Sequence, residues 1–244
     1  MHLIGLIGGM SWESSALYYQ RLNQGIAARL GGLHSAQCIL YSVDFAEIEA
    51  MQSSGRWTDA AGRLAQAAKS LEAAGADVLL LCTNTMHKVY DDVQAAVSIP
   101  LIHLGDTTAA AVLSGGLTRV GLLGTAFTMD QAFYRDRLEQ HGLTVLVPGK
   151  QDRQLVHDVI YDELCQGIVR PESRDAYRAV VGRLVDRGVE GIVLGCTEIE
   201  LLIGQGDSPV PVFPTTQIHV DAAIDWALTS SKTGAAGRVD HPVR

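Results

Sequence analysis

The fold of this chain is indicated by two matching stretches, Gly75-Ala-Asp-Val-Leu-Leu-Leu-Cys-Thr-Asn-Thr85 and Gly188-Val-Glu-Gly-Ile-Val-Leu-Gly-Cys-Thr-Glu198, which align without a gap. Each is a glycine turn, an apolar run of strand length, and a small polar or thiol cluster where the strand should end. Thr83 of the first stretch aligns with Cys196 of the second. Ligands of open α/β sheets bind beyond the carboxyl ends of the strands. Two such ends facing each other would place one reactive group on each side of a small substrate.

Two further pairs of segments repeat in the same order along the chain. Leu3-Ile-Gly-Leu-Ile-Gly8 resembles Arg119-Val-Gly-Leu-Leu-Gly124, and Ile99-Pro-Leu-Ile102 resembles Val210-Pro-Val-Phe213. The period is too long for a solenoid. The three matches therefore indicate two copies of one α/β unit.

Apolar runs suited to buried strands alternate with helix-length segments along the chain. The expected strands are 2–7, 37–43, 77–82, 100–103, 119–123, 143–147, 190–195 and 210–213. The expected helices include 13–29, 58–73, 87–96, 130–140, 152–166 and 172–187. Such alternation produces parallel sheets with helices on both faces.

We therefore expect an α/β protein with two similar parallel-sheet domains, related by a pseudo-twofold axis, and an active site in the cleft between them. The first domain should comprise 1–102 and a last helix at 215–228, and the second 103–214. The segment 229–244 lacks apolar periodicity, so we expect it to be a disordered tail.

The composition narrows the class of protein. The chain has 244 residues, a formal net charge of −8, 47% hydrophobic residues and 19% charged residues, as a soluble globular protein would. Its negative charge argues against nucleic-acid binding, which needs clustered Lys and Arg. We find no apolar run of membrane-spanning length and no secretory signal. The expected location is the cytoplasm, and the expected partner is a small molecule, with no nucleic acid or membrane.

The cysteines do not indicate a metal site. The chain contains Cys38, Cys82, Cys165 and Cys196, and none of them forms a CxxC pair, so no metal is predicted. In a reducing cytosol such thiols are buried or catalytic. A cysteine in an apolar strand is usually a small hydrophobic residue, which is our interpretation of Cys38.

The glycine-rich segment Gly5-Leu-Ile-Gly-Gly9 has two interpretations. It has neither the lysine of a P-loop nor the GxGxxG spacing of dinucleotide-binding proteins. It could be only a tight strand-to-helix turn. Alternatively, Gly8, Gly9 and Met10 could bring backbone amides to a ligand carboxylate. Such local donors would be needed in this protein, because its net negative charge does not attract an anionic ligand.

Polar groups follow the two repeated strands. Asn84 and Thr85 donate and accept hydrogen bonds, although a turn with capping residues is the simpler interpretation. His87 could orient a catalytic group or be a structural histidine. Cys196 in Gly195-Cys-Thr-Glu198 is the strongest candidate. A thiol at a helix N-terminus has a lowered pKa and more thiolate.

These residues resemble the aspartate/glutamate racemase family, which also includes hydantoin racemases, glutamate racemase, maleate isomerase and arylmalonate decarboxylase. The resemblance covers about 1–228 and rests on Gly8-Gly-Met10, Asn84-Thr85-Met-His87, Thr125 and Gly195-Cys-Thr-Glu198. It implies two similar α/β domains with the active site between them and catalysis without a cofactor. In the family's racemases, two cysteines face opposite sides of the substrate α-carbon. Related racemases are often dimers, so we expect a homodimer.

The first family motif differs here. The usual Cys-Asn-Thr is replaced by Thr83-Asn-Thr85, and Cys82 stands one place earlier, where a strand residue points to the opposite face. The chain is most similar to a branch of acidic amino-acid racemases with a Thr/Cys pair. That resemblance implies that Cys196 removes the α-proton and that Thr83, through a water, protonates the other face. Activity should then favour one enantiomer, which we expect to be L.

The substrate-binding positions differ as well. Gln52 stands where aspartate racemases commonly carry an arginine, and Cys165 stands where they carry a lysine. Neutral donors such as Gln52, Thr125 and Thr128 could still bind aspartate or glutamate and would tolerate other side chains. The expected substrate-binding residues are Met10, Gln52, Asn84, Thr85, Thr125, Cys165, Thr197 and Glu198.

The leading hypothesis is therefore a cofactor-independent amino-acid racemase that acts on aspartate or glutamate. A second hypothesis is a single-cysteine decarboxylase of the arylmalonate type. A third is a non-catalytic protein that binds an amino acid.

Overall fold

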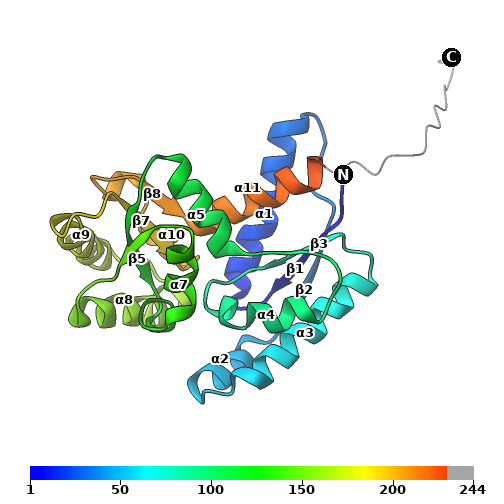
Figure 1. Ribbon diagram of the computed structural model, residues 1–244, viewed down its shortest axis with the longest axis horizontal. Coiled ribbons are helices and arrows are strands. Elements are labelled where there is room, and N and C mark those ends of the chain that lie inside the picture. The colour runs from blue at the N-terminus through cyan, green and yellow to red at the C-terminus, as the bar shows by residue number, and fades with distance from the viewer. Residues whose placement is uncertain (230–244) are drawn as a thin grey trace, which may run out of the picture.

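The computed structural model describes residues 1–229, which form two four-stranded parallel sheets (Figure 1). The first sheet has the order β2-β1-β3-β4 and the second the order β6-β5-β7-β8. The strands are β1 (Ile4–Gly8), β2 (Cys38–Ser42), β3 (Val78–Leu81), β4 (Leu101–Ile102), β5 (Arg119–Gly124), β6 (Thr144–Leu146), β7 (Gly191–Gly195) and β8 (Val212–Pro214). Each lies within or beside its predicted range, so the predicted fold class is confirmed.

The two sheets have the same topology, which explains the sequence repeat. β1 and β5 lie second in their sheets, β3 and β7 third, and β4 and β8 last. In the first sheet, Ile7 pairs with Leu81, and in the second, Gly124 pairs with Gly195. The carboxyl ends of the repeated strands therefore lie side by side within each sheet.

Helices cover both faces of the first sheet (Figure 1). Ile4, Leu6 and Val78 point to one face, and Ile7 and Leu79 point to the other. The first face carries α1 (Trp12–Leu30) and α11 (Thr215–Thr229), and the second carries α2 (Phe45–Ser53), α3 (Trp57–Ala73), the 3-10 helix η1 (Thr85–Val89) and α4 (Tyr90–Ala95). Burial on both faces accounts for the continuous apolar runs of these strands.

The second sheet is covered in the same way. One face carries α8 (Lys150–Asp162), the 3-10 helix η2 (Leu164–Gln166), α9 (Pro171–Asp186) and α10 (Ile199–Leu202). The other carries α5 (Leu104–Ser114) and α7 (Ala132–Gln140). Two short elements, α6 (Ala126–Asp130) and the 3-10 helix η3 (Gln205–Asp207), follow β5 and α10.

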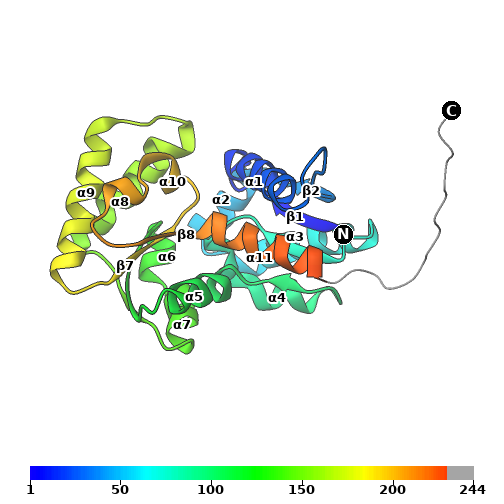
Figure 2. The same ribbon diagram turned by 90° about the horizontal axis from the view of Figure 1, so that it is seen from above.

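The chain passes from the first sheet to the second between β4 and α5, and it returns between β8 and α11. Figure 2 shows α11 extending from the second sheet across the first, and it packs against both α1 and α5. We propose these two crossovers as the domain boundaries, which corresponds to 1–102 with 215–228 and to 103–214. Of the predicted tail 229–244, Thr229 ends α11 and the rest lies outside the described residues.

Some helices differ from the predicted ranges. The helix ranges named from the sequence do not include α2 or α5. α5 packs between the second sheet and α11 and is rich in small apolar residues, so it has no clear polar face. The predicted helix 152–166 ends earlier, at Asp162, and continues as η2. No helix within 1–229 is long and apolar enough to cross a membrane.

Candidate active site

The carboxyl ends of β1, β3, β5 and β7 open into one cleft between the sheets. The ten residues predicted to be catalytic or substrate-binding all line it: Met10, Gln52, Thr83, Asn84, Thr85, Thr125, Cys165, Cys196, Thr197 and Glu198. Thr128, the further neutral donor named from the sequence, is fully buried and is not among the described lining residues. Phe45, Ile160, Tyr161 and Gly195 line the cleft as well and were not predicted.

The turn after β1 is built by Gly9, whose φ of 92° suits glycine. A Cβ on Gly9 would collide with the backbone of Val43. The Gly9 amide donates to Ser15 Oγ at 2.7 Å. This amide is therefore engaged within the turn, which corrects the expectation that Gly9 offers it to a ligand carboxylate.

Cys196 and Glu198 form a buried pair where β7 ends. The Cys196 thiol donates to Glu198 Oε2 at 2.9 Å. The other carboxylate oxygen accepts from Ser11 Oγ at 2.7 Å and from Ser14 Oγ at 2.8 Å. Both serines belong to the first domain, at the start of α1. The carboxylate of Glu198 therefore joins the two domains beside the candidate catalytic thiol.

The expected lowering of the Cys196 pKa is wrong. Burial raises the pKa of this thiol well above its usual value, and the negative charge of Glu198 raises it further. A hydrogen bond from the Glu198 backbone amide opposes this shift but is weaker. The following helix α10 has a single turn, Ile199–Leu202, so its dipole cannot outweigh a neighbouring carboxylate. The thiol is thus protonated and hydrogen-bonded to an anion.

Thr83 and Cys82 point in opposite directions, as strand alternation predicts. Thr83 lines the cleft. Cys82 is fully buried in the core that β1 and β3 form with α1 and α11, and its thiol is 4.0 Å from the Leu80 carbonyl oxygen. Burial raises its pKa far above the ordinary value. Cys82 is therefore part of the core and not of the cleft.

Asn84 brings an unpaired acceptor to the cleft. Its Nδ2 donates to Thr215 Oγ1 at 3.2 Å, whereas its buried Oδ1 has no partner among the described residues. Leaving a buried acceptor unpaired costs about 1–3 kcal/mol, so a donor on a ligand would be stabilised there. Nearby, the hydroxyl groups of Thr85 and Thr125 lie 3.2 Å apart.

The part of the cleft around Gln52 and Cys165 is neutral. The residues described as lining the cleft include no Lys, Arg or His. Burial, followed by the charge of Glu198, raises the pKa of Cys165 to about 12, so this thiol is uncharged. The side-chain amide of Gln52 donates to Met86 Sδ at 2.9 Å.

His87 lies behind Thr83 and is not among the residues that line the cleft. Its Nδ1 is 2.7 Å from the Thr83 carbonyl oxygen, and its Nε2 accepts from the Leu104 amide at 3.1 Å. The ring thus contacts the backbone of a cleft residue without lining the cleft itself.

The sequence matches the Asp/Glu/Hydantoin racemase family over residues 7–223. The chain belongs to this family. Its membership, together with the relatives described next, supports an amino-acid racemase type of function.

Among solved structures, this member of the Asp/Glu/hydantoin racemase family is similar to a Yersinia pestis protein proposed to be an Asp/Glu racemase. The two are 55% identical with a TM-score of 0.89, over 94% of this chain and 100% of that one. An aspartate racemase homologue from Pyrococcus horikoshii OT3 is 36% identical with a TM-score of 0.83, over 93% of this chain and 99% of that one.

A curated relative is the broad specificity amino-acid racemase RacX of Bacillus subtilis (strain 168). It is 23% identical over 164 residues, which are 66% of this chain and 69% of that one. An arylmalonate decarboxylase with 14% identity and a TM-score of 0.56 shares the fold.

Sequence reasoning missed the partners of Glu198 in this family member. Ser11 caps α1 by accepting a hydrogen bond from the Ser14 amide, and both serines also bind Glu198. Their bonds to Glu198 span 187 and 184 residues. A resemblance between strand ends cannot reveal such a contact, because it depends on how the two domains dock.

Proposed function

We propose that this protein is a cofactor-independent amino-acid racemase that acts on aspartate or glutamate, with Cys196 as the α-proton acceptor and Thr83 on the opposite side of the substrate. The observation that carries this proposal is the Cys196 thiol hydrogen-bonded to Glu198 at 2.9 Å, in a cleft that Thr83 also lines. A thiol needs a base to become a thiolate, and a carboxylate in hydrogen-bond contact supplies one.

The proton route follows from these contacts. The thiol proton moves to Glu198, and the resulting thiolate accepts the α-proton of the substrate. The Thr83 hydroxyl, resupplied through water, delivers a proton to the other face of the α-carbon. Glu198 then releases its proton to solvent, which balances the proton taken up on the Thr83 side. A hydroxyl is a much weaker base than a thiolate, so we expect one enantiomer to be the better substrate. We propose that this enantiomer is L.

The cleft offers partners for the substrate's own groups. The unpaired Asn84 Oδ1 suits the substrate ammonium group, which has donors only. The hydroxyl groups of Thr85 and Thr125 suit a carboxylate, as neutral donors. Gln52 and the Tyr161 hydroxyl remain for the side-chain carboxylate of aspartate or glutamate.

The test is proton NMR of L- and D-aspartate and L- and D-glutamate incubated with the enzyme in D₂O, with chirality assayed in parallel. We expect the α-proton signal to disappear with inversion, and faster from the L enantiomers. Cys196→Ala should abolish exchange. Cys38→Ala, which replaces a cysteine of β2 outside the cleft, should leave the exchange rate unchanged.

Other outcomes would contradict this proposal in defined ways. Full exchange in Cys196→Ala would mean that Cys196 is not the base. Equal exchange from both enantiomers would mean that a second competent base exists. Release of carbon dioxide from a substituted malonate without amino-acid exchange would indicate a decarboxylase, and tight binding without exchange would indicate a binding protein.

A further inference from the structure

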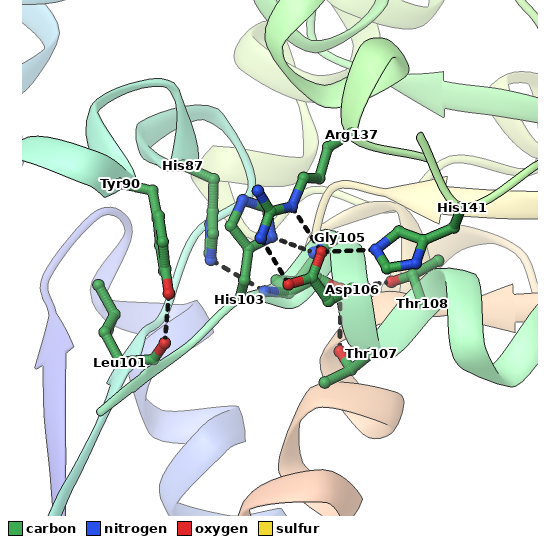
Figure 3. A network of polar contacts seen from close by, with 11 residues as sticks. His87, Tyr90, Leu101, His103, Gly105, Asp106, Thr107, Thr108, Arg137 and His141 are labelled. Carbon is green, nitrogen blue, oxygen red and sulfur yellow. Dashed lines mark hydrogen bonds and ion pairs between the residues drawn. The ribbon is translucent and has the colours of Figure 1, made fainter. Parts of the chain in front are cut away.

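A buried imidazole connects the loop of Thr83 to the start of the second domain. His87 Nδ1 lies 2.7 Å from the carbonyl oxygen of Thr83. On the other side of the ring, Nε2 lies 3.1 Å from the backbone nitrogen of Leu104, the first residue of α5. Figure 3 shows the ring of His87 close to the start of α5, beside His103 and Tyr90.

The two partners fix the proton on the ring. A carbonyl oxygen can only accept, so Nδ1 carries the hydrogen, and a backbone amide can only donate, so Nε2 is the acceptor. Neutral imidazole satisfies both bonds, whereas imidazolium would point a second N–H at the Leu104 amide. Burial lowers the pKa of His87 to about 4, so the ring is neutral near pH 7. The titratable and charged groups around it are Tyr90, His103, Asp106, Arg137 and His219.

Side chains also bind the backbone of the segment around Leu104, which His87 contacts. Along the crossover between β4 and α5, side chains hydrogen-bond to successive backbone groups: Tyr90 to Leu101 O at 2.8 Å, His219 to Ile102 O at 2.9 Å, and His103 to Gly105 N at 2.9 Å. Asp106, in the first turn of α5, pairs with Arg137 of α7 at 2.5 Å. His103 and the Asp106–Arg137 pair therefore fix the start of α5 in the second domain, whereas Tyr90 and His219 fix the end of β4 in the first. The Leu104 amide is the anchor on the second-domain side of this boundary.

We propose that His87 is a positioning residue, which holds the backbone of Thr83 at a fixed place relative to the second domain that carries Cys196. The inference rests on the proposed function, because it assumes that Thr83 delivers a proton opposite to Cys196. The alternative is that His87 only fills the core. That role would not require both ring nitrogens to bond to backbone groups of two different domains.

Two substitutions test the two hydrogen bonds of the ring one at a time. In His87→Asn the side-chain amide nitrogen occupies the place of Nδ1, so the bond to the Thr83 carbonyl is kept and the bond to Leu104 is lost. In His87→Gln the side-chain oxygen reaches the place of Nε2, so the bond to Leu104 is kept and the bond to Thr83 is lost. Each variant loses one buried hydrogen bond, so both should show a similar fall in Tm.

The decisive readout is the ratio of inversion to exchange for the L substrate in D₂O. When Thr83 is misplaced, Cys196 still removes the α-proton, and deuterium returns from the same side. We expect His87→Gln to lower kcat at least tenfold with KM within threefold, and to accumulate deuterium in unreacted L substrate. His87→Asn keeps the bond to Thr83 but loses the link to the second domain, so it should shift the ratio in the same direction. Thr83→Val, which lacks the hydroxyl, should behave as His87→Gln does.

A second variant tests the anchor if His87→Gln does not fold. Leu104→Pro removes the amide that donates to His87, at the first position of a helix, where proline is tolerated. It also replaces a fully buried leucine side chain. It should also shift the ratio toward exchange without inversion. Equal ratios in wild type, His87→Gln and His87→Asn, or an unshifted ratio in Leu104→Pro, would overturn the inference. Absence of any exchange in the wild-type protein would instead contradict the proposed function.

Discussion

At the scale of single residues, the unusual feature of the site is a carboxylate that hydrogen-bonds to the thiol it is proposed to deprotonate. Glu198 both raises the pKa of Cys196 by its charge and offers the nearest place for the thiol proton. The two effects oppose each other in the resting enzyme. A variant without the charge of Glu198 should show the effect on the Cys196 pKa and the loss of the proton acceptor separately.

Glu198→Gln is therefore expected to lower the pKa of Cys196 and the activity together. Removal of the anion makes the thiolate easier to form, which should appear as a shift of the thiolate absorbance near 240 nm to lower pH. Loss of the proton acceptor should reduce kcat by about 100-fold or more. Glu200→Gln, a matched change at a buried carboxylate that pairs with Arg21 at 2.6 Å, should leave this titration unchanged. An unshifted titration with full activity in Glu198→Gln would refute this account.

The neutral side-chain end of the cleft predicts weak discrimination of charge. With no cationic side chain among the described lining residues, kcat/KM for L-aspartate over L-asparagine should stay within about tenfold, which is about 1.4 kcal/mol. Cys165→Lys should raise that ratio at least tenfold, because it adds a cation. Cys165→Met, a neutral side chain of similar length, should not. The ratio cancels any general loss of activity, and an unchanged ratio in Cys165→Lys would contradict the prediction.

At the scale of elements, the strands could be predicted because each is a continuous apolar run. A strand that is buried on both faces of its sheet requires such a run. The candidate site could be predicted at Thr83 and Cys196 because the repeat aligned two strand ends. α5 could not be predicted, since apolar residues such as Ala110 and Leu113 occupy exposed positions, so its sequence lacks a clear polar face. The pKa of Cys196 could not be predicted either, because it depends on burial and on how the Glu198 side chain turns back.

The turn after β1 provides a prediction at this scale. Gly9 has φ of 92°, and a Cβ there would meet the backbone of Val43. Gly9→Ala should lower the free energy of unfolding by more than about 2 kcal/mol, because steric collision adds to the backbone strain. Gly32→Ala, at φ of 57° with open space around it, should cost only about 1–2 kcal/mol. Urea unfolding of both variants measures the difference, and equal losses would contradict it.

At the scale of the whole molecule, three buried histidines gather where the chain crosses between the domains. Burial lowers the pKa of His87 to about 4, of His219 to about 3 and of His103 to about 2. An unfolded histidine titrates near 6.5. Below that pH the unfolded chain binds protons that the folded chain does not, so acid favours unfolding.

We expect the free energy of unfolding to be insensitive to these groups above pH 6.5 and to fall below it. Each imidazole contributes up to about 1.4 kcal/mol per pH unit. In His219→Gln, the slope between pH 6.5 and pH 5 should be smaller by about that amount. Urea unfolding at a series of pH values provides the measurement, and an identical slope in the variant would refute it.

The return of the chain to the first domain has a consequence for the order of its segments. The end of α11 lies beside the start of the chain, where the His2 amide donates to the Ala227 carbonyl at 3.1 Å. A circular permutant that joins residue 229 to residue 1 and opens between 102 and 103 would read 103–214 and then 215–229 followed by 1–102. The first domain would become one uninterrupted segment. The two domains would then be tethered by a single covalent connection, so their closure on a substrate would depend on side-chain contacts such as that of Glu198 with Ser11 and Ser14.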